Sequence, residues 1–128
     1  MNQTKARTKV LIVDDEPNIV LALDFLMQKQ GLTTAQAFNG EQALDVVKTF
    51  QPDLVILDVM MPGIDGFEVA RRIRRVVEND YINIIFLTAK GTQKDKIKGY
   101  STGGDVYLTK PFDNDQLSEM VVEMLQYG

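Results

Sequence analysis

The sequence of 128 residues contains no cysteine and no histidine. Without cysteine the chain forms no disulfide and has no thiol nucleophile, so a secreted disulfide-stabilised scaffold is excluded. Without histidine it lacks the commonest general base, and the absence of both residue types excludes a zinc cluster. Any chemistry must therefore use carboxylates, hydroxyls, lysine or a bound metal.

The chain also lacks a long apolar run and an excess of positive charge. Residues 1–9 are polar and basic, and no signal peptide or membrane span follows them. We therefore expect a cytoplasmic protein without membrane contact. The formal net charge of −4 argues against direct nucleic-acid binding by this domain. A run of arginines leaves a phosphate-binding stripe open, although a solvated helix face is the favoured interpretation; these are Arg71, Arg72, Arg74 and Arg75.

Short apolar runs alternate with amphipathic stretches along the whole chain. This pattern predicts one α/β domain over residues 1–128, with residues 1–8 as a flexible N-terminal extension. Strands are expected at 10–13, 33–37, 54–57, 83–87 and 106–109. A helix follows each strand, and the last two are expected at about 93–100 and 114–126. In the third helix the spacing predicts that the inward-facing residues are Phe67, Val69, Ala70, Ile73 and Val76.

Repeated strand–helix units with continuous apolar strands predict a parallel sheet covered by helices on both faces. In such open sheets the functional site lies beyond the carboxyl ends of the strands. Polar residues stand at four of these ends: Asp14, Asp15 and Glu16 after the first strand, Asp58 after the third, Thr88 after the fourth and Lys110 after the fifth.

Each of these residues also has a structural explanation. Asp15, which precedes Pro17, could be a helix N-cap, and Asp58 could simply terminate a strand. Taken singly, Thr88 is more simply a threonine whose hydroxyl is hydrogen-bonded within the fold, and Lys110 is more simply a surface lysine. Their joint arrival at one edge of one sheet favours a functional site over independent coincidence.

The residue types at this edge indicate phosphoryl chemistry. Carboxylates packed together resist ionisation unless a cation lies among them, and oxygen donors alone suit a hard cation such as Mg²⁺. A carboxylate beside Mg²⁺ can act as the nucleophile and form an aspartyl phosphate. The three phosphoryl oxygens would then be contacted by Mg²⁺, by the Lys110 ammonium, and by the Thr88 hydroxyl together with a nearby backbone N–H.

The chain resembles the CheY-like receiver domains of response regulators in two-component signal transduction, along essentially its whole length. Four segments carry the resemblance: VLIVDDE at 10–16, LDVMMPGIDG at 57–66, LTA at 87–89 and GDVYLTKPF at 104–112. The resemblance implies a flavodoxin-like doubly wound (βα)5 fold with strand order 2-1-3-4-5.

The resemblance also implies a role for each site residue. Asp58 would be the phosphoacceptor, Asp15 a metal ligand, Asp14 the holder of metal-bound water and Met60 the source of a carbonyl ligand to Mg²⁺. In the same way, three further residues would sense and transmit the phosphoryl group: Thr88 with Lys110 would contact it, Ala89 would supply the backbone N–H, and Tyr107 would be the aromatic switch. From the residues alone, Tyr107 is more simply a half-buried strand tyrosine.

The implied partners are a sensor histidine kinase or a histidine phosphotransfer protein, which would phosphorylate the chain. Output would pass to a downstream protein or to a second copy through the face of the fourth helix, fifth strand and fifth helix. Two departures from the family pattern bear on this face: Val106 replaces a frequent second acid, and the last helix contains acids but no arginine. The charged dimer face of the winged-helix branch is therefore not evident.

Two other functions fit the sequence less well. A haloacid-dehalogenase-like phosphatase also uses a strand-end aspartate and Mg²⁺, but it typically needs a second acid where this chain has Met60. A flavin-binding module on the same fold is disfavoured because three acids would repel the flavin phosphate. We therefore expect a phosphoacceptor that catalyses its own phosphorylation and dephosphorylation, rather than an enzyme that turns over an external substrate.

Overall fold

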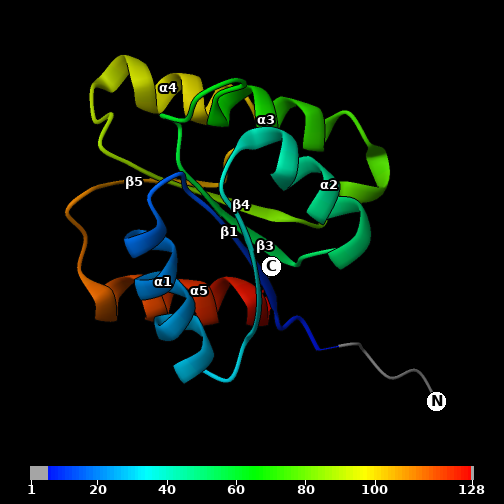
Figure 1. The fold of residues 1–128 in the computed structure, drawn as a ribbon, viewed down its shortest axis with the longest axis vertical. Coiled ribbons are helices and arrows are strands. Elements are labelled where there is room, and N and C mark those ends of the chain that lie inside the picture. Colours follow the sequence, from blue (N-terminus) through cyan, green and yellow to red (C-terminus); the bar gives the residue numbers. More distant parts are fainter. Residues whose placement is uncertain (1–5, 128) are drawn as a thin grey trace.

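The computed structural model describes residues 6–127, so most of the expected extension over residues 1–8 lies outside the described residues. The elements in chain order are β1 (Lys9–Val13), α1 (Pro17–Lys29), β2 (Thr33–Ala37), α2 (Gly40–Phe50), β3 (Leu54–Leu57), α3 (Gly66–Arg74), the short 3₁₀ helix η1 (Val77–Asn79), β4 (Asn83–Thr88), α4 (Gln93–Ser101), β5 (Val106–Thr109) and α5 (Asn114–Tyr127) (Figure 1). Within this part of the chain no helix combines the length and the apolar character needed to cross a membrane.

The five strands form one sheet in the order β2-β1-β3-β4-β5, and all neighbouring strands are parallel. Helices α2, α3 and α4 lie on one face of this sheet, whereas α1 and α5 cover the other (Figure 1). The flavodoxin-like (βα)5 fold and its strand order are therefore confirmed. All five carboxyl ends point to the same edge, which places the residues that follow the strands close together.

The core consists of two apolar layers separated by the sheet. Because side chains alternate across a strand, Leu11 and Val13 of β1 pack toward α2 and α3. Val10 and Ile12 of the same strand pack toward α1 and α5. Both faces of the three central strands are thus buried, which explains why their sequences are continuously apolar.

The end of α3 differs from the sequence prediction. The helix ends at Arg74, and Val76, expected to face inward, is 46% exposed. The guanidinium of Arg74 donates to the carbonyls of Gly103 at 3.0 Å and Ile82 at 2.6 Å. These bonds connect the end of α3 to distant loops, and the chain becomes extended at Val76 instead of continuing the helix.

Candidate functional site

The four predicted polar side chains lie at the carboxyl edge of the sheet. Asp14 follows β1, Asp58 follows β3, Thr88 is the last residue of β4, and Lys110 follows β5. The residues Asp14, Asp58 and Thr88 are only 2%, 4% and 0% exposed. Two carboxylates and a hydroxyl are therefore removed from water at this edge, and such groups need polar partners.

The Lys110 ammonium joins the two buried carboxylates. Its Nζ donates to Asp14 Oδ2 at 2.8 Å and lies 3.5 Å from Asp58 Oδ2. The three residues are 44 or more positions apart in sequence, and only the strand order brings them together. This arrangement holds two negative charges and one positive charge in a partly desolvated edge of the protein.

Backbone contacts fix the position of Asp58. Its N–H donates to the Val13 carbonyl at 3.0 Å, and its carboxylate accepts from the Met60 N–H at 3.2 Å. A Cβ placed on Gly66 would lie 2.2 Å from the Asp58 carbonyl oxygen and 2.8 Å from the Cα of Val59. The start of α3 therefore touches the backbone of the candidate nucleophile. Sequence reasoning had not singled out Gly66, whose only signal was its place in the LDVMMPGIDG segment.

Three consecutive acids form the group that could hold a metal ion. Carboxylate oxygens of Asp14, Asp15 and Glu16 lie within 4.8 Å of one another. The N-cap of α1 is Glu16, which makes no side-chain cap bond, so capping does not account for Asp15. This donor set contains only carboxylate oxygen, which fits Mg²⁺ and does not suit softer metals. The Met60 residue, whose carbonyl the family resemblance assigns to the metal, is 53% exposed beside Asp58.

Burial and charge act in opposite directions on the pKa values of the site. Burial raises the pKa of Asp14 above 3.8, although hydrogen bonds from Lys110 and from the Glu16 N–H partly oppose this. Burial alone would lower the pKa of Lys110, but the hydrogen bond to Asp14 and the charge of Asp58 raise it above 10.5. At neutral pH the ammonium therefore stays charged, whereas ionised Asp14 is held at a cost to stability.

We expect Asp14→Asn to raise the free energy of unfolding by about 1 kcal/mol in metal-free buffer at neutral pH. The folded-state pKa of Asp14 exceeds 3.8, so the folded state binds this proton more tightly than the unfolded state. The stabilising effect of the protonated carboxyl is complete below 3.8 and is lost as pH rises through the folded-state pKa. The advantage of the variant should shrink as pH falls toward 3.8 in thermal unfolding experiments. An advantage that grows on acidification would contradict this account.

Thr88 and Tyr107 are connected through the backbone of Lys90, which hydrogen-bonds to both side chains. The Thr88 hydroxyl accepts a hydrogen bond from the Lys90 N–H at 3.3 Å, and the Tyr107 hydroxyl donates to the Lys90 carbonyl at 2.6 Å. A displacement of the Thr88 hydroxyl would therefore disturb the segment that holds the tyrosine. For Ala89, no hydrogen bond from its N–H to a site side chain occurs among the described residues.

The Tyr107 ring is turned into the protein and is 6% exposed. It lies 5.7 Å from the ring of Phe86, and burial raises the pKa of its phenol to about 12, with smaller contributions from nearby carboxylates. A Cβ on Gly99 of α4 would lie 2.5 Å from this ring. Gly99, which sequence reasoning also missed, thus lets α4 pack directly on the inward tyrosine. A single glycine in a helical pattern offers little signal for such a contact.

Comparisons with known proteins agree with this geometry. A family model described as response regulator receiver domain matches residues 10–122. A putative response regulator from Chloroflexus aurantiacus is 34% identical with a TM-score of 0.87, covering 93% of this chain and 98% of that one. The receiver domain of the Francisella response regulator 1452 is 33% identical with a TM-score of 0.86, covering 93% and 97%. The chemotaxis response regulator CheY4 of Vibrio cholerae is 29% identical with a TM-score of 0.85, covering 91% and 98%.

Proposed function

Because the chain belongs to the response regulator receiver domain family of two-component systems, we propose that it accepts a phosphoryl group on Asp58 in a Mg²⁺-dependent reaction. The observation that carries the proposal is the Lys110 ammonium held between the buried carboxylates of Asp14 and Asp58. A positive charge fixed beside a buried carboxylate is what phosphoryl transfer to that carboxylate requires, because charge on the phosphoryl oxygens must be balanced.

In the proposed reaction an oxygen of Asp58 forms a bond to phosphorus. The bond between phosphorus and the donor, a phosphohistidine nitrogen or the acetate oxygen of acetyl phosphate, breaks and the donor leaves with its electron pair. Asp58 is positioned for this by its backbone bonds to the sheet and by the Met60 N–H on its carboxylate. No general base is needed because a carboxylate nucleophile has no proton to lose.

The proposed ligands of Mg²⁺ are Asp15, Asp58 and the carbonyl of Met60, and Asp14 would hold a water bound to the ion. When bound, the ion supplies a divalent charge for a phosphoryl oxygen. Asp15 is exposed and makes no helix cap, so its carboxylate is available, while Asp14 lies at the buried end of the same group. Lys110, whose Nζ lies beside Asp14 Oδ2 and Asp58 Oδ2, would supply the second positive charge.

We further propose that Thr88 and Tyr107 convert phosphorylation into a change of shape. The Thr88 hydroxyl, drawn toward a phosphoryl group on Asp58, would lose its bond from the Lys90 N–H. Because the carbonyl of Lys90 holds the Tyr107 hydroxyl, the ring and the packing of α4 over Gly99 would respond. Hydrolysis of the aspartyl phosphate, catalysed by the protein itself, would reset this switch.

The proposed phosphodonor partner is a sensor histidine kinase or a histidine phosphotransfer protein in the cytoplasm. Leu21 and Phe25, on the solvent side of α1, are 61% and 64% exposed. They stand one and two turns beyond the acidic residues, so a helical partner that presents a phosphohistidine to Asp58 could pack on them. These exposed apolar side chains support docking of a protein at this side of the site.

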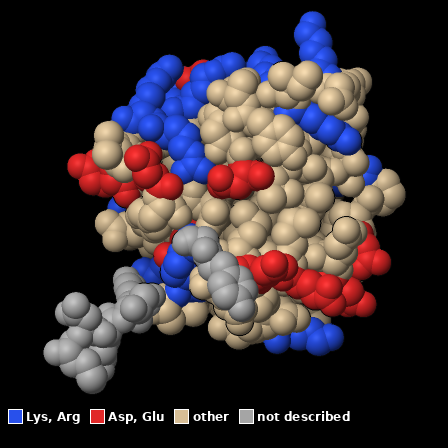
Figure 2. All heavy atoms as spheres, turned by 180° about the vertical axis from the view of Figure 1, so that it is seen from behind, with Lys and Arg blue, Asp and Glu red and all other residues tan. Residues whose placement is uncertain are grey.

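The proposed output surface is the α4–β5–α5 face, which would bind a downstream protein or a second copy of the chain. On α4, Ile97 and Tyr100 are 60% and 52% exposed. Lys and Arg gather over the upper part of the molecule, where α3 and α4 lie (Figure 2).

Light scattering with and without Mg²⁺ and beryllofluoride, an aspartyl-phosphate mimic, distinguishes the two outputs: a dimer indicates self-association, and a monomer with bound mimic indicates a different partner.

Incubation with Mg²⁺ and acetyl phosphate should add one phosphoryl group to the protein, measured by intact-mass spectrometry. Asp58→Asn should abolish the addition because an amide oxygen is a poor nucleophile toward phosphorus. The matched control is Asp45→Asn, which removes an exposed carboxylate from α2 and should leave the reaction unchanged. Incorporation that survives Asp58→Asn, or that proceeds equally well in excess EDTA, would refute the assignment.

A further inference from the structure

Exposed apolar side chains gather at the connection between α3 and β4. Val76, Val77 and Tyr81 are 46%, 74% and 46% exposed. Most of the other large apolar side chains exposed in residues 6–127 lie on α1, on α4 or beside Asp58, where the proposed function uses them, and Phe38 stands alone in the loop after β2. The α3–β4 connection is at the opposite end of β4 from Thr88, so this gathering is not explained by the phosphoryl site.

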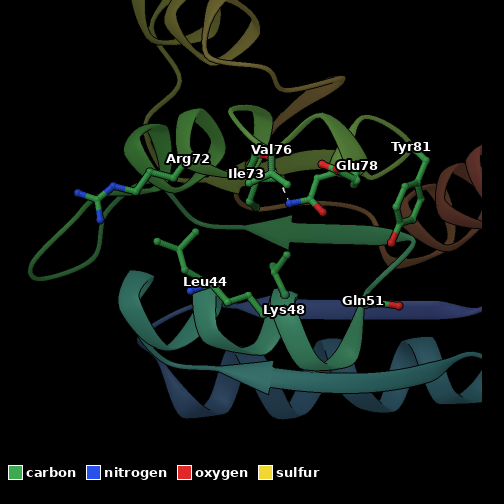
Figure 3. A pocket seen from close by; sticks show the side chains of 10 residues that line it. Leu44, Lys48, Gln51, Arg72, Ile73, Val76, Glu78 and Tyr81 are labelled. Carbon is green, nitrogen blue, oxygen red and sulfur yellow. Dashed lines mark hydrogen bonds between the residues drawn. The ribbon is translucent and has the colours of Figure 1, made fainter.

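A groove of about 700 Å³ lies beside these side chains, between α2 and the end of α3 (Figure 3). Its floor is apolar and is formed by Leu44 and Val47 of α2 and by Ile73 of α3, and Val76 and Tyr81 form its lip. Val47 and Ile73 are only 4% and 1% exposed, so the floor is part of the protein core. Figure 3 shows the side chains of α2 and of the α3–β4 connection facing one another across the groove.

Hydrogen bonds hold the backbone of the α3–β4 connection beside the groove. Arg7 donates from Nη2 to the Tyr81 carbonyl at 2.9 Å, and Asn79 donates from Nδ2 to the Ile73 carbonyl at 3.3 Å. The bonds from Arg74 hold the same connection on its other side. A hollow whose backbone is held in this way is pre-organised for a ligand, because little backbone conformational entropy is lost on binding.

Arg72 and Lys48 line the groove as cations from its two sides, and Glu78 is the one acidic side chain among the lining residues. The positive charge on the α3 side extends beyond the groove. Three guanidinium groups, of Arg71, Arg72 and Arg75, share one carboxylate, Glu68, at 3.4, 2.9 and 3.9 Å. The hydrogen bond from Arg72, with the charges of its neighbours, lowers the pKa of Glu68. One carboxylate cannot balance three guanidinium groups, and Lys48 across the groove forms no ion pair within residues 6–127.

We propose that this groove binds an acidic amphipathic helix of a protein partner. Leucine-sized side chains of the helix would occupy the floor over Val47 and Ile73, and its carboxylates would lie beside Arg72 and Lys48. Two adjacent helices, α2 and α3, present the kind of channel into which a third helix packs. A helix rather than a small molecule is favoured because Val77 extends the apolar surface beyond the hollow, over an area that a small ligand would leave uncovered.

The probe for this proposal is a synthetic helical peptide of about 18 residues with leucines on one face and glutamates beside them. Its twin carries lysine in place of every glutamate. Both are titrated into the isotope-labelled 128-residue protein, and amide chemical shifts are followed. We expect the acidic peptide to shift signals of α2 and of the α3–β4 connection, with an affinity at least about tenfold higher than that of the lysine twin.

Variants of exposed residues distinguish the groove from other surfaces without threatening the fold. Val76→Ser with Tyr81→Ser should weaken the acidic peptide at least about tenfold, because large side chains dominate such contacts. Leu21→Ser, which removes an equally exposed apolar side chain from α1, is the matched control and should leave the affinity unchanged. Arg72→Glu with Lys48→Glu should reverse the preference in favour of the lysine twin.

Three results would overturn the proposal. These are equal affinity for the two peptides, chemical-shift changes that map to α1 or α4, and the absence of peptide binding. If the anionic dye 1-anilinonaphthalene-8-sulfonate shifted the groove signals while neither peptide bound, the site would belong to a small anionic ligand instead. Binding of the acidic peptide to the groove should persist in Asp58→Asn. A failure of the groove proposal can therefore be told apart from a failure of the proposed phosphoryl chemistry.

Discussion

Lys110→Met is expected to lower the free energy of unfolding by about 3–5 kcal/mol in metal-free buffer at neutral pH. The lysine side chain is 16% exposed, between carboxylates that are 3% and 6% exposed. Methionine has a similar length but no charge, so the variant leaves Asp14 and Asp58 facing each other without a cation. Urea-induced unfolding of the two proteins measures the difference.

A matched control and a metal titration make this result specific. Lys48→Met removes an exposed lysine that has no ion pair in the described part of the chain, and it should change stability by no more than about 0.5 kcal/mol. Saturating Mg²⁺ should stabilise Lys110→Met more than the unmodified protein, because it restores positive charge among the carboxylates. A loss in Lys110→Met no larger than that in Lys48→Met would show that the ammonium does not hold this site together.

Gly66→Ala is expected to lower the free energy of unfolding by about 3 kcal/mol or more. The added Cβ would lie 2.2 Å from the Asp58 carbonyl oxygen and 2.9 Å from its carbonyl carbon. These are backbone atoms of a buried strand end, so they cannot turn aside as the tip of a flexible side chain can. Either α3 or the backbone of Asp58 must shift, and phosphoryl transfer should slow together with the loss of stability.

Gly31→Ala separates this steric effect from the conformational cost of replacing a glycine. Gly31 has φ of +81° and no atom within 4 Å of an added Cβ, so only the left-handed backbone conformation penalises alanine. We expect a loss of about 1 kcal/mol, typical of a left-handed residue that gains a Cβ. Chemical denaturation of both variants tests the ranking, and a smaller loss for Gly66→Ala than for Gly31→Ala would rule out the proposed contact.

The elements followed well from local sequence patterns and the strand order followed from the family resemblance, whereas the end of α3 was not predicted. Apolar runs such as 54–57 are continuous because both faces of the strand are buried, and this signal is local. The end of α3 depends on Arg74, whose guanidinium bonds to a carbonyl 29 residues away. Helical spacing alone extended the inward face to Val76, because spacing contains no information about such a long-range bond.

Some residues of the candidate site could also be predicted from the sequence, and others could not. Asp14, Asp58, Thr88 and Lys110 could be placed at one edge from their positions after strands, since parallel strands bring their carboxyl ends together. Their proposed roles stay predictions. Gly66 and Gly99 could not be found, because their importance lies in the atoms that approach them from other elements. A residue that matters through the absence of a side chain leaves no chemical pattern.

The inward position of Tyr107 also limits the protein in alkaline solution. Its phenol donates to the Lys90 carbonyl, and burial raises the pKa of this phenol to about 12 from the ordinary value of 10.0. Between these values the unfolded chain releases a proton that the folded chain retains, so rising pH favours unfolding. The same burial that would let this tyrosine report on the phosphoryl site therefore makes it a base-sensitive point in the fold.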